Sequence, residues 1–100
     1  MKPYVTAETL GYKVGQWLEK VRLYNQHEMI LKRDRCALIV VDMQQFCLNP
    51  DSPTFTCGGL AIIPTLKRLI EAFRDVGRPV LFTRHVHHPD KIDSGVMGWW

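Results

Sequence analysis

The chain has 100 residues, of which 46% are hydrophobic and 23% are charged. This is the composition of a globular domain with one modest core, and it excludes the disordered and collagen-like classes. The net charge of +3 comes from 13 basic and 10 acidic residues, which are interspersed except for a short mixed run at 32–35. Because nucleic-acid proteins concentrate their basic residues in a patch with aromatic residues, we expect no nucleic-acid partner.

Two further classes are excluded by what the sequence lacks. Its apolar runs are all shorter than the roughly 18 residues that a membrane span needs, and the N-terminus has no apolar core of a signal peptide. We therefore expect a cytoplasmic protein without a membrane partner. The three cysteines, at 36, 47 and 57, lack the C-x-x-C spacing of a zinc or redox site, so we expect free thiols in a reducing compartment.

Residues 1–35 form an N-terminal extension. Between Val14 and Ile30 the apolar residues recur at the spacing of one helical face, with charged residues opposite them. This pattern predicts an amphipathic helix that packs outside a sheet. Such a helix could cover the core or make an oligomer contact.

The run from Ala37 to Val41 is apolar without a break, and it stops at the carboxylate of Asp42. A short, β-branched-rich run of this kind predicts a strand of a parallel sheet that is buried on both faces. In open α/β sheets, ligands bind outside the carboxyl ends of the strands. Asp42 is therefore the first candidate for a chemical role.

A loop, a helix and a second strand follow. Turn residues, among them Gly58 and Gly59, indicate a binding loop over 45–59. The apolar spacing predicts a helix over 62–74, with Pro64 in its first turn and Gly77 in the left-handed position just past its end. The run 79–84 predicts the next buried strand, with Pro79 at its first residue.

A strand, a helix and a strand in this order predict a right-handed βαβ unit with parallel strands. The ends of both strands then open on one edge of the sheet, at Asp42 and near 84–87. Because a doubly wound domain usually has five or six strands, we expect these residues to be the N-terminal portion of a larger fold. The apolar pair Trp99 and Trp100 at the end of the sequence favours the same expectation.

In combination, the D-x-Q sequence from Asp42 to Gln44, the Pro53 and Gly58-Gly59 loop, and the G-R-P-V-L-F-T-R-H run over 77–85 resemble the isochorismatase-like cysteine hydrolases. The resemblance covers residues 36–100. It implies a three-layer α/β/α fold with a parallel, Rossmann-like sheet, of which this sequence holds the first βαβ portion. It also implies a homo-oligomer.

The same resemblance implies a chemistry. Family members that hydrolyse amides use an Asp, a Lys and a Cys, and Asp42 matches the Asp. The Lys and the Cys are expected beyond residue 100. The implied function is cleavage of a C–N bond in a small amide or carbamoyl substrate. Two alternatives stay open: a vinyl ether hydrolase that uses the Asp as general acid, and a non-catalytic binding or assembly subunit of the same fold.

The expected site residues lie on the segments that follow the two strands. The resemblance implies that Asp42 is the catalytic acid/base, and the expected substrate contacts are Gln44, Phe46, His87 and Trp99. The resemblance also implies that Gln44 braces the loop by hydrogen bonds. His85 and His87 project to one side of an extended strand and could share a divalent metal. Relatives with a metal there carry an Asp where this chain has His85, so we expect no metal and no cofactor.

Overall fold

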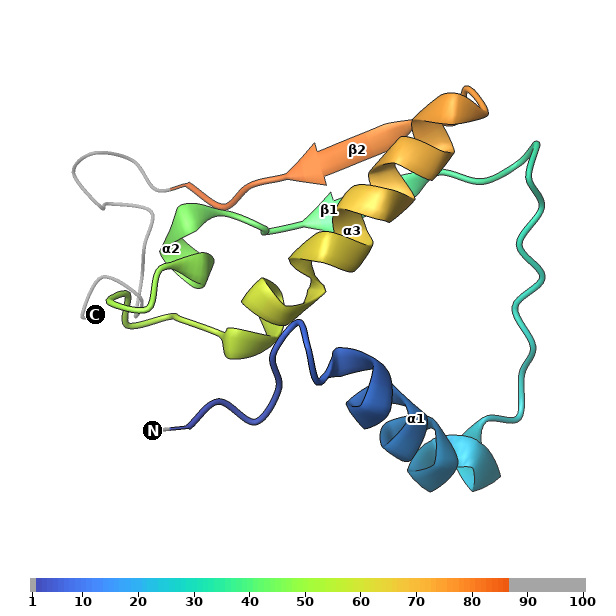
Figure 1. The fold of residues 1–100 in the computed structure, drawn as a ribbon. Helices are drawn as coiled ribbons and strands as arrows, with labels where there is room; N and C mark the ends of the chain where they lie inside the picture. Colours follow the sequence, from blue (N-terminus) through green and yellow to red (C-terminus); the bar gives the residue numbers. More distant parts are fainter. Residues whose placement is uncertain (1, 87–100) are drawn as a thin grey trace.

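A computed structural model describes residues 2–86 of the chain (Figure 1). Its strands are β1 (Leu38–Val41) and β2 (Val80–Thr83). The α-helices of the described residues are α1 (Leu10–Val21), α2 (Gln45–Leu48) and α3 (Cys57–Asp75), and a 3₁₀ turn, η1 (Arg22–Tyr24), extends α1. The order β1, α3, β2 confirms the predicted strand–helix–strand unit and the α/β class.

The two strands are parallel, as predicted, and their register pairs Val40 with Phe82 and Val41 with Thr83. Two hydrogen bonds join the chain segments at the N-terminal ends of the two strands. The Leu38 amide donates to the Pro79 carbonyl over 3.0 Å, and the Arg78 guanidinium donates to the Cys36 carbonyl over 2.8 Å. Both strands therefore begin together and end together, which brings Asp42 beside the exit of β2.

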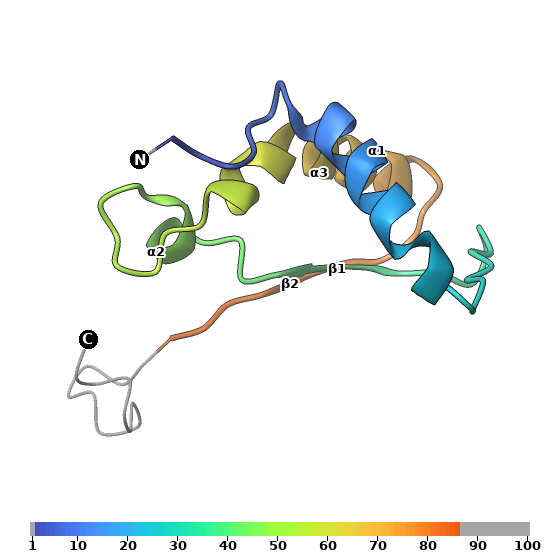
Figure 2. The same cartoon turned by 90° about the horizontal axis from the view of Figure 1, so that it is seen from below.

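All three α-helices of the described residues lie on one side of the sheet (Figure 2). The buried apolar residues are on that side: Val40 of β1 is 4% exposed and Ala61 of α3 is 1% exposed. On the opposite face, Ile39, Val41 and Leu81 are between 51% and 62% exposed. Residues 2–86 thus supply a sheet and one helical layer of the expected three-layer fold.

Helix α3 begins five residues earlier than the predicted start at 62, so the prediction that Gly58, Gly59 and Pro64 mark a loop and a first turn was wrong. The glycines serve close packing instead. A Cβ atom on Gly59 would lie 2.7 Å from the Leu48 side chain of α2, and one on Gly58 would lie 2.9 Å from the Tyr4 hydroxyl. Pro64 lies inside the helix, where its ring removes one backbone hydrogen bond.

The end of α3 is as predicted. Gly77 has φ +69°, in the left-handed region that glycine enters without steric cost. The Gly77 amide donates to the Arg74 carbonyl over 3.0 Å, and the Arg78 amide donates to the Phe73 carbonyl over 2.8 Å. This pair of bonds is a Schellman motif, which stops the helix and turns the chain into β2.

The N-terminal helix differs from the prediction over 14–30. It starts at Leu10, ends with η1 at Tyr24, and buries none of its residues. Residues 25–37 form neither helix nor strand, and Asn25 and Glu28 stand at the next positions of the apolar face and interrupt it. The first residues of the extension contact α3: Val5 is buried, and the Tyr4 hydroxyl lies close to Gly58. Within the extension, the Tyr4 ring lies 6.4 Å from that of Trp17.

Candidate active site at the strand ends

The chain leaves β1 through a left-handed residue. Asp42 has φ +54°, and it is the one non-glycine residue with a positive φ among residues 2–86. Asp tolerates this conformation better than most residues, because its short carboxylate can hydrogen-bond locally. The turn ends the β1 ladder and leaves the Asp42 side chain exposed at the carboxyl end of the sheet, where α/β proteins place their ligands.

Thr83, the last residue of β2, holds Asp42 from the neighbouring strand. Its hydroxyl donates to the Asp42 Oδ1 atom over 3.3 Å and accepts from the Asp42 amide over 3.2 Å. The same amide also lies 3.3 Å from the Thr83 carbonyl oxygen. One hydroxyl thus contacts both the backbone and the carboxylate of the candidate catalytic residue.

Gln44 makes two hydrogen bonds to the backbone of His85. Its Nε2 atom donates to the His85 carbonyl over 3.1 Å, and its Oε1 atom accepts from the His85 amide over 2.9 Å. These are bracing bonds of the kind that the D-x-Q resemblance implies. The bonds use the Nε2 and Oε1 atoms of the Gln44 side chain, which are the same atoms that a substrate would contact. The expected substrate contact of Gln44 stays a prediction.

Phe46 lies on α2 and is 53% exposed, so its ring is accessible near the strand ends. The loop that follows is compact. The Thr54 hydroxyl donates to the Phe46 carbonyl over 2.7 Å, and the Thr56 amide donates to the Cys47 carbonyl over 3.0 Å. These bonds return the chain to the start of α3 and position α2 beside the exit of β1.

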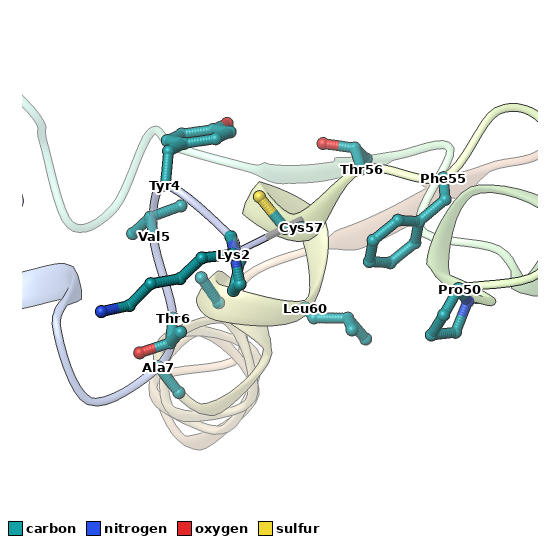
Figure 3. A pocket seen from close by; sticks show the side chains of 12 residues that line it. Lys2, Tyr4, Val5, Thr6, Ala7, Pro50, Phe55, Thr56, Cys57 and Leu60 are labelled. Atoms are coloured by element: carbon teal, nitrogen blue, oxygen red, sulfur yellow. The ribbon is translucent and has the colours of Figure 1, made fainter.

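A separate hollow of about 870 Å³ lies between the N-terminal segment and the start of α3 (Figure 3). Its wall is largely apolar and includes Cys57, whose thiol is half-buried. Asp42, Gln44 and Phe46 do not line it. This hollow is therefore distinct from the polar cluster at the strand ends.

The three thiols are free, as predicted, and each is half-buried. Residues 2–86 contain no group of three or more His, Cys, Asp or Glu side chains that could hold a metal ion. Two expected substrate contacts, His87 and Trp99, lie outside the described residues. None of the helices within residues 2–86 is long and apolar enough to cross a membrane.

Sequence reasoning missed Thr83. The predicted strand 79–84 includes it, but the threonine reads there as an ordinary β-branched strand residue. The available signal was its position: it is the first polar side chain of the strand, and parallel register places it opposite the residue before Asp42. A polar residue at that point faces the same edge as the carboxylate.

A parallel βαβ unit with a hydrogen-bonded carboxylate at the carboxyl ends of its strands defines the chain as an α/β protein with a strand-end site. The family model of the isochorismatase domain matches residues 36–99, and the chain belongs to this family. Over 70 residues the chain is 37% identical to an N-carbamoylsarcosine amidase from Arthrobacter sp. The match covers 67% of this chain but 26% of that relative, so the chain spans about a quarter of its length. No solved structure gives a significant match.

Proposed function

We propose that the protein hydrolyses a C–N bond of a small amide or carbamoyl compound, with Asp42 as the general acid/base. The observation that carries the proposal is the geometry of Asp42, a carboxylate held in a left-handed turn at the carboxyl ends of two parallel strands. Family membership and the likeness to a relative named as an amidase support it.

In the proposed mechanism, Asp42 works with a Lys and a Cys that lie outside residues 1–100. The Asp42 carboxylate accepts the proton of the cysteine thiol, and the thiolate attacks the substrate carbonyl. Asp42 then passes the proton to the leaving amine as the C–N bond breaks. Water hydrolyses the resulting thioester and regenerates the thiol. The role of the Lys is to order and polarise the pair.

The exposure of Asp42 fits this role, because a proton-transfer group must reach both the nucleophile and the leaving group. A second fitting feature is its fixed backbone. A residue at φ +54° that is hydrogen-bonded through both its amide and its carboxylate has few orientations open to it. General acid/base groups act well when their position is set before the substrate binds.

The test is the Asp42→Asn variant of the full-length protein, assayed for amine or ammonia release from a panel of small carbamoyl and amide compounds. Asparagine has the same shape and also tolerates the left-handed region, so the fold should persist. We expect kcat to fall by roughly a hundredfold or more, because general acid/base catalysis contributes 10²–10⁴-fold.

Two control variants separate chemistry from general damage. Asp51→Asn makes the same change in the loop that follows α2, and Cys47→Ala removes a thiol on α2. Both should keep the wild-type rate. Full turnover by Asp42→Asn would overturn the assignment. Cleavage of a vinyl ether substrate in place of all amides would indicate the isochorismatase-type reaction instead.

A further inference from the structure

The strongest polar feature outside the proposed proton transfer is the pair of contacts that β2 makes with the segment after β1. The Thr83 hydroxyl is hydrogen-bonded to Asp42 as donor and as acceptor at once. A threonine hydroxyl has one donated proton, and here it points to the carboxylate. The rotation of the Asp42 side chain is therefore coupled to the position of β2.

The Gln44 side chain continues the sheet where the backbone cannot. The Asp42 amide still donates to the Thr83 carbonyl, and the positive φ at Asp42 then turns the chain away from β2, so the ladder between the two strands ends there. The Gln44 side-chain amide bonds both the backbone amide and the carbonyl of His85, which are groups that a continued β1 would have bonded through its own backbone. Gln44 thus holds the chain at His85, two residues after Thr83, close to Asp42.

We propose that Thr83 is a positioning residue that aims the Asp42 carboxylate, and that Gln44 keeps Thr83 in place by clamping the backbone of His85. The proposal rests on the proposed function, since it assigns both residues to the orientation of its acid/base. Gln44 could act by positioning or by contacting the substrate, and kinetics separate these roles, because loss of a positioning residue lowers kcat and loss of a substrate contact raises KM.

The first arm of the test compares Thr83→Val with Thr83→Ser in the full-length protein. Valine keeps the shape and loses the hydroxyl, whereas serine keeps the hydroxyl. We expect Thr83→Val to lower kcat by roughly ten- to a hundredfold, because misplacing a reacting group by about 1 Å can cost 10²-fold. Its KM should stay near the wild-type value, and Thr83→Ser should restore most of kcat.

The matched control is Thr65→Val. Thr65 lies on α3, where its hydroxyl accepts from Arg68 over 3.2 Å, so the same chemical change occurs away from the strand ends. This variant should keep the wild-type kcat. An equal fall of kcat in Thr65→Val and Thr83→Val would overturn the proposal, because it would show a general effect of losing a threonine hydroxyl.

The second arm replaces Gln44 by methionine, which has a similar length and cannot form either bond. We expect kcat to fall with little change in KM. A rise of KM at unchanged kcat would overturn the positioning role and assign Gln44 to the substrate instead.

The third arm does not depend on turnover. The ¹³Cγ and amide resonances of Asp42 report its hydrogen bonds, and we expect both to shift in Thr83→Val, to return in Thr83→Ser and to stay in Thr65→Val. Unmoved Asp42 resonances in Thr83→Val would overturn the positioning role. If the resonances shift but Asp42→Asn keeps full activity, the contact is real and the proposed function fails.

Discussion

At the scale of single residues, Asp42 must supply a carboxylate to the proposed reaction and must also adopt a left-handed backbone conformation. A left-handed residue with a Cβ atom costs energy, and such strain tends to occur at functional sites. Here the carboxylate and amide of Asp42 are both hydrogen-bonded to Thr83. Substitutions can therefore separate the need for a carboxylate at this position from the need for a residue that tolerates a positive φ.

We expect the free energy of unfolding of Asp42→Gly to exceed that of Asp42→Ala by about 1 kcal/mol, because glycine enters the left-handed region without the steric cost that alanine meets. Both variants should lack turnover, since neither has a carboxylate. Urea unfolding and the hydrolysis assay on the same preparations check this. Equal stability of the two variants would contradict a strained φ at this position.

The sequence predicted the place of Asp42 at the end of a strand, and it predicted the residues around Asp42 less well. An apolar run that stops at an acid is a local signal, so both the strand end and the carboxylate could be placed from residues 37–42. The partnership with Thr83 depends on the register of two strands that are separated by 41 positions in the chain. The two apolar runs do not show by themselves which of their residues pair, which is why the hydroxyl was not assigned to the site.

At the scale of elements, α3 shows why helix ends differ in how well they can be predicted. Its C-terminus can be predicted from a few neighbouring residues, because Gly77 adopts the left-handed conformation that ends the helix without steric cost. Its N-terminus follows from packing. Gly58 and Gly59 read as loop residues, yet α2 and Tyr4 approach them so closely that a side chain would collide. Tertiary contact therefore extends the helix through residues of low propensity.

We predict that Gly77→Ala lowers the free energy of unfolding by about 1–2 kcal/mol, because alanine at φ +69° meets the steric cost of the left-handed region. The matched substitution is Gly15→Ala inside α1, where an added Cβ meets nothing within 4 Å. It should instead stabilise the helix, by about 0.5–1 kcal/mol. Denaturant unfolding and helical circular dichroism of the two variants check the opposite signs.

At the scale of the whole molecule, the helices of the described residues cover one face of the sheet only in part, since Val40 is 4% exposed and Phe82 beside it is 60% exposed. They leave the other face open. Ile39 and Val41 lie on the same open face of β1, and Leu81 pairs with Ile39 across the strands. Parallel sheets are almost always covered on both faces. We propose that this face is covered in the native assembly, and that the protein is the homo-oligomer that its family resemblance implies.

This arrangement has a consequence for a polypeptide of residues 1–100 produced on its own. Its described residues bury few large side chains, and a two-stranded sheet is marginal in water. We therefore expect the polypeptide to bind the dye ANS and to unfold without a sharp transition. The double variant Ile39→Lys, Val41→Lys should lower ANS fluorescence, because it breaks a continuous apolar surface.

The matched double variant Met29→Lys, Leu31→Lys changes two exposed apolar residues of the extended segment and should lower the fluorescence less, since that segment forms no continuous sheet surface. Fluorescence and thermal melts of the three polypeptides decide the matter. An equal fall in both double variants would contradict a dye site on the sheet. A sharp melt without dye binding would show that the face is covered, and the mass in solution would then reveal whether a second copy of the polypeptide covers it.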